Sequence, residues 1–267
     1  MEDTPIVALD LARTLKVAEA AARAAGTYLL QKLGFARVAS QKALNDDLLD
    51  ADLEVEHLLL THLRKETPDL GILSEEQVSQ EAGKHYWIVD PLDGSANFQR
   101  GSPLFAIAIA LVFNQVPQAS IVYLPTQNEM FTAIQNQGAF LNGKRIHVSS
   151  TSTIDQAIIH VGDFSKGNNT QQVYDRLGDV LQLITRVRRV RMIGTAAMDL
   201  AYLACGRADG LINYANDPWD IEAGKLLLVE AGGQVSTRRY ANRTMAVYSN
   251  GIIHQDIEKL LSPSSSA

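Results

Sequence analysis

The segment Trp87–Phe98 has the sequence WIVDPLDGSANF, in which a strand-like apolar run leads directly into two carboxylates, Asp90 and Asp93. Pro91 has a fixed φ and favours an extended conformation for the residue before it. Gly94 can adopt dihedral angles that other residues avoid, so it can turn backbone N–H groups toward one point. A strand end that carries acids beside N–H donors suits a divalent cation and a phosphate together.

Two helices and a short strand are predicted before this segment. Thr4 and Pro5 suit the N-cap and first position of a helix, and apolar residues then recur at helical spacing to about Leu33. A second helix is predicted over 50–64, ahead of a proline, and a strand over 71–74.

Antiparallel strands are predicted after the segment, and alternating strands and helices follow them. Short polar turns separate apolar runs over 105–113, 118–124 and 129–134, which predicts a meander, and Asn142-Gly143 predicts a hairpin turn. Beyond about residue 150 we expect strands over 157–161, 187–193 and 210–214, helices over 171–184, 195–204 (with Gly206 as its C-cap) and 221–231, two short strands and a last helix. This order predicts an α+β half over 1–150 packed against an α/β half over 151–267.

The composition indicates an ordinary soluble globular protein. The chain has 267 residues, of which 46% are hydrophobic and 20% charged. A net charge of -6 argues against a surface dedicated to nucleic acid. Cys205 is the one cysteine, which excludes an intrachain disulfide and fits a reducing compartment. The acidic N-terminus resembles neither a signal peptide nor a membrane span, so we expect a cytoplasmic protein without a membrane partner.

Acidic side chains stand at several predicted strand ends and helix starts: Glu75, the pair Asp90 and Asp93, and Asp220. Taken singly, each fits an ordinary structural role. Glu75 suits a solvated turn, the aspartate pair an Asx-type turn, and Asp220 the N-cap of the helix after it. Brought together, they would repel one another unless a cation lay between them. Oxygen ligands favour magnesium, manganese or calcium over zinc, and the six histidines are scattered.

Other chemistries have less support in the sequence. It contains no Gly-x-Ser-x-Gly elbow, Walker loop or Gly-x-Gly-x-x-Gly fingerprint. Cys205 lies in an apolar run and suits the core better than a nucleophile. The basic run Arg186–Arg191 fits a solvated strand face or a subunit contact better than an anion or RNA site.

The motifs resemble those of the inositol monophosphatase family. The stretch Asp90–Phe98 with Gly101-x-Pro103 is similar to the family's first signature. The stretch 219–233, which begins Trp-Asp-x-x-Ala-Gly and ends Glu-Ala-Gly-Gly, is similar to its second. Supporting matches, in family order, are Gln41-Lys42 with Asp46 and Asp52, Ser74-Glu75-Glu76, and Gly194-Thr195-Ala196-Ala197.

This resemblance implies a layered α/β/α/β/α fold of the inositol monophosphatase and fructose-1,6-bisphosphatase type, usually dimeric. It also implies lithium-sensitive hydrolysis of phosphomonoesters with two to three magnesium ions, for which manganese can substitute, while calcium or lithium inhibits. Inositol 1-phosphate is the default substrate. Histidinol phosphate, fructose 1,6-bisphosphate, a nucleotide 3′-phosphate and NADP stay open, although Asn97-Phe98 argues against the nucleotide branch.

The resemblance also assigns roles to residues. Glu75, Asp90 and the carbonyl of Leu92 would hold the first magnesium. Asp90, Asp93 and Asp220 would hold the second, and Glu75 would help to hold a third. Ser95 completes the expected catalytic set. The expected substrate contacts are Asp93, Gly94, Ser95, Gly194, Thr195, Ala196, Asn213 and Asp220.

Two departures from the family pattern bear on function. Leu49 stands where the family usually has a threonine that positions the attacking water, which implies slower turnover; Ser95 replaces a second threonine and keeps its hydroxyl. Asn213 stands where inositol enzymes place a glutamate, which weakens the preference for inositol. The alternative from another class is a non-catalytic factor bound to RNA polymerase or the ribosome, which we favour less because the metal-binding acids are all present.

Overall fold

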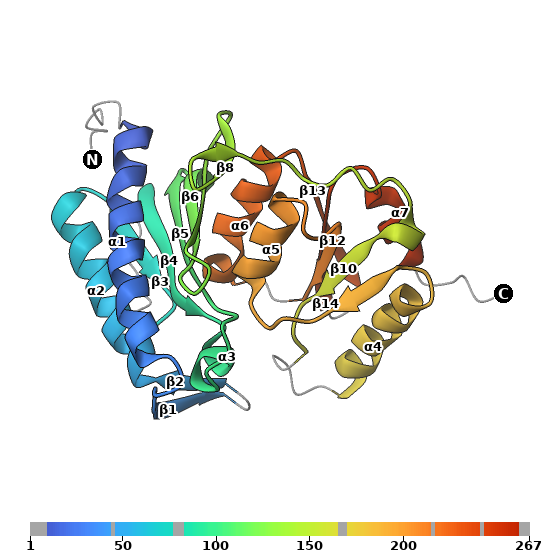
Figure 1. Cartoon of the computed structure of the whole chain (residues 1–267), viewed down its shortest axis with the longest axis horizontal. Coiled ribbons are helices and arrows are strands. Elements are labelled where there is room, and N and C mark those ends of the chain that lie inside the picture. Colours follow the sequence, from blue (N-terminus) through green and yellow to red (C-terminus); the bar gives the residue numbers. More distant parts are fainter. Residues whose placement is uncertain are drawn as a thin grey trace.

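The computed structural model describes residues 10–43, 46–76, 83–164, 170–214, 217–240 and 243–261. Two β-sheets alternate with layers of helices (Figure 1). Helices α1 (Leu11–Lys32) and α2 (Asp50–Glu66) cover the outer face of the first sheet. Helices α5 (Ala196–Ala204) and α6 (Pro218–Glu230) lie between the two sheets, and α4 (Thr170–Ile184) and α7 (His254–Leu260) cover the far face of the second. The expected five-layered architecture is confirmed.

In the described residues, the first sheet has seven strands in the order β3-β4-β5-β6-β7-β8-β9. Its strands are β3 (Gly71–Ser74), β4 (His85–Asp93), β5 (Ala106–Phe113), β6 (Val116–Leu124), β7 (Glu129–Ile134), β8 (Gly138–Leu141) and β9 (Lys144–Arg145). Among the described residues of this sheet, β3 and β4 form its one parallel pair, and β5, β6 and β7 form the predicted antiparallel meander. Asn142 and Gly143 both have positive φ, as the predicted hairpin turn requires. Strand β5 is an apolar run because helices cover both faces of the sheet.

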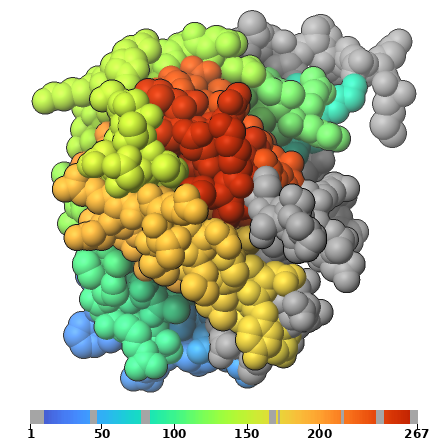
Figure 2. Space-filling model, turned by 90° about the vertical axis from the view of Figure 1, so that its right-hand side faces the viewer, coloured from blue at the N-terminus to red at the C-terminus, as the bar shows by residue number. Residues whose placement is uncertain are grey.

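The second sheet, as far as the structure describes the chain, has five strands in the order β11-β10-β12-β14-β13. After the short 3₁₀ helix η1 (Ile154–Gln156) come β10 (Ile158–Val161), β11 (Arg189–Arg191), β12 (Gly210–Asn213), β13 (Gln234–Tyr240) and β14 (Arg243–Ser249). Strands β10, β11 and β12 are parallel; β14 pairs antiparallel with β12, and β13 pairs antiparallel with β14. Figure 2 looks onto this end of the molecule, where α4 and α7 form much of the surface.

Some predicted boundaries are wrong, and short elements were missed. Thr4 and Pro5 lie outside the described residues, and α1 begins at Leu11 with Asp10 as its N-cap. The strand expected over 187–193 is only three residues long. The hairpin β1 (Val38–Ala43) and β2 (Asp46–Leu49) and the short helix α3 (Ser95–Gln99) were not predicted. The first sheet uses residues 71–145 and the second 158–249; a division into separate domains near residue 150 stays a prediction.

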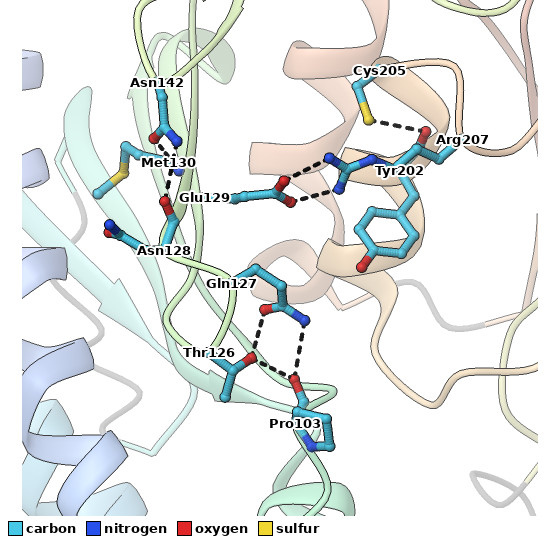
Figure 3. A network of polar contacts seen from close by, with 10 residues as sticks. All are labelled: Pro103, Thr126, Gln127, Asn128, Glu129, Met130, Asn142, Tyr202, Cys205 and Arg207. Carbon is cyan, nitrogen blue, oxygen red and sulfur yellow. Dashed lines mark hydrogen bonds and ion pairs between the residues drawn. The ribbon is translucent and has the colours of Figure 1, made fainter.

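Specific polar contacts join the layers. The Arg207 guanidinium follows α5 and donates to both carboxylate oxygens of Glu129 on β7, at 2.5 and 2.6 Å (Figure 3). The same guanidinium lies over the Tyr202 ring. This ion pair ties the end of α5 to the first sheet. In the described part of the chain, no helix is long and apolar enough to cross a membrane.

Candidate active site

Glu75 and Asp90 come together because β3 and β4 are parallel neighbours. Ser74 pairs with Val89 in the register of the two strands. The Glu75 N–H then donates to the Val89 carbonyl at 3.2 Å. Glu75 and Asp90 are thus the residues that come directly after a paired position on the two strands. The carboxyl ends of neighbouring parallel strands meet at one edge, which brings these side chains into electrostatic range.

The Asp90 carboxylate is buried, with 1% of the residue exposed. Its Oδ1 accepts a hydrogen bond from the Leu92 N–H at 3.0 Å, which is the expected Asx-type turn. Its Oδ2 is buried and has no hydrogen-bond partner among the described residues. Burial raises the pKa of Asp90 well above its usual range, and the nearby charges of Glu75, Asp93 and Asp220 raise it further. An unpartnered carboxylate oxygen among three other acids is what a divalent cation would satisfy.

Asp93 is fixed by the start of α5. A bulge in β4 between Asp90 and Asp93 separates the two carboxylates. The Asp93 Oδ2 accepts hydrogen bonds from the Thr195 hydroxyl at 2.6 Å and from the Ala197 N–H at 2.7 Å. Burial, followed by the charge of Asp220, raises the pKa of Asp93 to about 7, although both hydrogen bonds act in the opposite direction.

Asp220 reaches the same cluster from α6. The helix expected over 221–231 begins earlier, at Pro218, and Asp217 occupies the N-cap position, which excludes the ordinary N-cap role weighed for Asp220. Asp220 therefore lies inside the first turn, where 8% of it is exposed. Its charge raises the pKa of both Asp90 and Asp93, so its carboxylate lies near each of them.

The turn at Gly94 needs a glycine. Its φ is +97°, and a side chain there would place Cβ only 2.9 Å from the Leu104 carbonyl oxygen. Ser95 then begins α3, and its hydroxyl donates to the Leu92 carbonyl at 3.0 Å, with the Asp52 Oδ1 at 3.4 Å. The carbonyl expected to bind the first magnesium thus already accepts one hydrogen bond, and its metal role stays a prediction.

Four of the expected substrate contacts lie at the start of α5 and at the end of β12. Gly194 has a φ of +77° and precedes Thr195, which is the N-cap of α5 and accepts from the Met198 N–H. Ala196 is partly buried in the first turn. Asn213 ends β12 and is buried over Gly162, where a Cβ would come within 2.4 Å of the Asn213 Oδ1. Contact of these residues with a substrate stays a prediction.

Glu56 was not singled out from the sequence. It is fully buried, one turn beyond Asp52 on α2, and the Ser74 hydroxyl donates to it. Asp52 accepts from the Leu49 N–H at 2.7 Å. The spacing of Asp52 and Glu56 puts both on one face of a helix, and that spacing was the available signal.

In the residues that the structure describes, no three acidic, histidine or cysteine side chains form a ready-made metal site. The charges of these acids raise the pKa of Asp90 and Asp93, but the four carboxylates do not form a complete set of metal ligands. Carboxylates repel one another when no cation lies between them, so an open arrangement is physically reasonable. The coordination geometry stays a prediction.

Cys205 and the basic run Arg186–Arg191 lie in the environments that their sequence context favours. Cys205 is partly buried against the apolar layer between the sheets, and burial raises the pKa of its thiol, which suits a core residue. Within the basic run, Arg188, Arg189 and Arg191 are exposed. The last two lie on β11, an edge strand of the second sheet, so the run includes a solvated strand face.

Comparison with known proteins gives a consistent answer. The model of the inositol monophosphatase family matches residues 10–263. The fructose-1,6-bisphosphatase/inositol-1-monophosphatase of Thermotoga maritima is 33% identical over 229 residues, which cover 84% of this chain and 86% of that protein. The Nus factor SuhB of Escherichia coli K12 is 38% identical over 226 residues, which cover 83% and 84%. The solved structure of a Thermotoga maritima IMPase superposes with a TM-score of 0.85 at 31% identity, over 93% of this chain and 96% of that one. The chain therefore belongs to the inositol monophosphatase family.

Proposed function

We propose that this protein is a magnesium-dependent phosphatase that hydrolyses a small phosphomonoester. The observation that carries the proposal is the cluster of four acids around the buried Asp90, whose Oδ2 has no hydrogen-bond partner among the described residues. Burial of several like charges is costly unless something compensates them. Hard oxygen ligands favour magnesium, with manganese as a substitute and calcium or lithium as inhibitory competitors.

The acids would divide the work of holding two or three ions. Glu75 and Asp90, on neighbouring strands, would hold the first, with help from the Leu92 carbonyl. Asp90, Asp93 and Asp220 would hold the second, because the charges of Asp93 and Asp220 both act on Asp90 and that of Asp220 also acts on Asp93. Glu75 would help to hold a third. The Thr195 hydroxyl and the Ala197 N–H, which both donate to the Asp93 Oδ2, fix the orientation of this carboxylate, so its Oδ1 can face an ion.

Magnesium supplies positive charge that makes water a better nucleophile and stabilises the leaving oxygen. The backbone N–H groups at Gly94 and Ser95 would donate to the phosphate, and such preorganised donors are worth on the order of 3 kcal/mol each in other enzymes. The Ser95 hydroxyl, with the Asp52 Oδ1 3.4 Å away, would orient the water. Gly194, Thr195, Ala196 and Asn213 would line the alcohol side of the substrate.

Inositol 1-phosphate is the first substrate to test, because relatives that share about a third of the sequence carry inositol monophosphatase names. Asn213 is neutral, so it would favour inositol less strongly than a glutamate would, which keeps fructose 1,6-bisphosphate, histidinol phosphate, nucleotide 3′-phosphates and NADP in the screen. The neutral side chain also repels a second phosphate less than a carboxylate would.

The decisive experiment measures phosphate release from these substrates with magnesium, with and without lithium, for the native protein and Asp90→Asn. We expect selective release from one substrate, inhibition by lithium, and loss of turnover in Asp90→Asn with a native circular dichroism spectrum. Release from Asp90→Asn at the native rate would contradict the metal assignment.

A second candidate function is a non-catalytic role in a transcription or ribosome complex. It is favoured by relatives named Nus factor SuhB at 37–38% identity and by the missing hydroxyl at Leu49. In the same screen, absence of release from every substrate would favour this role. Selective release would exclude a purely non-catalytic protein.

We further propose that the protein is a cytoplasmic homodimer. The exposed apolar residues Tyr174, Leu177, Leu181 and Ile184 lie on one face of α4, which forms part of the surface in Figure 2. A second copy that covered this face would remove these side chains from water. Light scattering at micromolar concentration tests the dimer, and a monomeric mass would contradict it.

A further inference from the structure

Besides the four acids, a buried pair of polar side chains joins helix α5 to the second sheet. His160 on β10 and Asp199 on α5 are each 1% exposed, and the His160 Nδ1 lies 2.6 Å from the Asp199 Oδ1. Burying a carboxylate and an imidazole together is costly, and an apolar pair of similar size would often be as stable. The pair therefore invites an explanation beyond stability.

Asp199 lies in the first turn of α5, the helix that holds Asp93. It is the only charged residue in a helix whose other buried side chains are apolar. Apolar packing is non-directional, so it defines the position and rotation of α5 between the sheets less sharply than a hydrogen bond does. The short hydrogen bond between Asp199 and His160 on β10 restricts both the translation and the rotation of α5. Any shift of α5 would carry Thr195 and Ala197 with it, and both donate to the Asp93 Oδ2.

The other end of the pair is tied to β12. His160 pairs with Leu211 in the parallel register of β10 and β12. Two residues further along the chain, the Gly162 N–H donates to the Ile212 carbonyl at 2.8 Å, and Asn213 packs over Gly162. His160 thus connects α5 to the strand pair whose carboxyl end carries Asn213.

We propose that the His160–Asp199 pair is a positioning element: it fixes α5 on the second sheet so that Thr195 and Ala197 orient the Asp93 carboxylate for a metal ion. The inference rests on the proposed function, because it assigns Asp93 to a cation. His160 and Asp199 touch neither substrate nor ion in this scheme. The His160 Nδ1 and the Asp199 Oδ1 share this hydrogen bond, and the His160 Nε2 is buried without a partner among the described residues.

The test compares two substitutions of His160 in the full chain. His160→Leu keeps apolar bulk and removes the hydrogen bond. His160→Asn places an amide where Nδ1 lies and so can still donate to Asp199. The control is His254→Leu, because His254 on α7 is equally buried and bonds through both ring nitrogens to Ser249 and Ser236. This control removes a buried histidine of the same half on the far side of the second sheet.

Two quantities are measured: magnesium affinity of the metal-stripped protein by calorimetry, and kcat and KM in the phosphate-release assay, all well below the unfolding temperature. We expect His160→Leu to weaken magnesium binding and lower kcat about 10-fold each, which is the usual scale for groups that orient a metal ligand. His160→Asn should recover most of both, and His254→Leu should lose stability but keep native affinity and kcat.

Each possible result either supports or contradicts the positioning role of the His160–Asp199 pair. Native magnesium affinity in folded His160→Leu would overturn the inference and leave the pair a structural contact. Equal loss in His254→Leu would overturn it too, because general destabilisation would then explain the effect. If His160→Leu does not fold, His160→Gln, whose amide reaches past the Nδ1 position, is measured against His160→Asn with the same expectations. A native protein that binds no magnesium refutes the proposed function itself, which separates that failure from failure of this inference.

Discussion

Leu49 is the residue at which this chain departs most sharply from the catalytic pattern of its family. It is 1% exposed and precedes α2, and its N–H is already held by the Asp52 carboxylate. A threonine here would offer a hydroxyl at the edge of the candidate site. We expect Leu49→Thr to raise kcat several-fold in the phosphate-release assay, at a cost of about 1–3 kcal/mol in stability from lost apolar burial.

Leu49→Val is the matched control, because valine has the shape of threonine without the hydroxyl. It should lose similar stability and gain no turnover. A valine variant as fast as the threonine variant would show that side-chain size, rather than a hydroxyl, limits the native enzyme.

Asp93 predicts a distinctive pH dependence of stability in the metal-free protein. Its pKa rises from an ordinary value of 3.8 to about 7 on folding, so the folded state binds the proton more tightly than the unfolded state does. The resulting stability is fully present below about pH 4, and it is lost as the pH rises to 7. Asn keeps the oxygen that accepts from Thr195 and Ala197 but never ionises.

Denaturant unfolding of the native protein and Asp93→Asn, both metal-free, tests this difference. We expect Asp93→Asn to gain stability relative to the native protein between about pH 4 and pH 8, by at most roughly 4 kcal/mol. Asp256→Asn on α7 is the control, because Asp256 is exposed and pairs with Lys259; it should show no such gain. A gap between native and Asp93→Asn that is the same at both pH values would contradict the raised pKa.

At the scale of elements, the crossing of α5 and α6 depends on one glycine. A Cβ at Gly224 would lie 2.6 Å from the Leu200 Cβ, so only glycine lets the two helices approach this closely. Gly224→Ala should destabilise the fold by about 1–3 kcal/mol, the usual range for overpacking a core. Gly178→Ala on α4 is the matched control, because a Cβ added at Gly178 would have no atom within 4 Å.

In an open helical position alanine is favoured over glycine by about 0.5–1 kcal/mol, so Gly178→Ala should stabilise the protein. Thermal unfolding monitored by circular dichroism measures both changes. Similar effects at the two glycines would mean that helix propensity, rather than the α5–α6 contact, governs Gly224.

Helices and strands could be predicted where the apolar pattern lies within one segment and extends over enough residues to show a period. The meander over β5 to β7 follows from apolar runs separated by polar turns, and the β8–β9 turn follows from Asn142-Gly143. The hairpin β1–β2 and the five-residue helix α3 carry too few residues to show a period. The start of α6 was misplaced because Pro218 can begin a helix and Asp220 also suits an N-cap.

The whole molecule decides which acids meet, and this is where sequence reasoning reaches its limit. That Glu75 and Asp90 each follow a strand-like apolar run is visible in local patterns, whereas the pairing of these two strands is not. That Thr195 and Ala197 would hold Asp93 depends on a helix more than 100 residues away in the chain. The His160–Asp199 pair likewise joins residues 39 positions apart across two elements, and neither residue has a distinctive sequence context.

Because the acids come from distant parts of the chain, a bound ion should stabilise the whole fold. A ligand that binds only the native state adds about 2.7 kcal/mol at 100 times its dissociation constant. For a chain of this size that corresponds to a rise of roughly 5–10 °C in Tm. We expect magnesium to raise the Tm of the native protein by this amount and to raise that of Asp220→Asn much less.

Glu222→Gln is the control on the same helix, because the Glu222 side chain pairs with Lys225 and lies outside the candidate metal set. It should respond to magnesium as the native protein does. If Asp220→Asn kept the full rise in Tm, then α6 would contribute no ligand, and the ion would be held by β3 and β4 alone. In that case the cluster would be a site of the first sheet, and the charge that Asp220 places beside Asp90 and Asp93 would need another explanation.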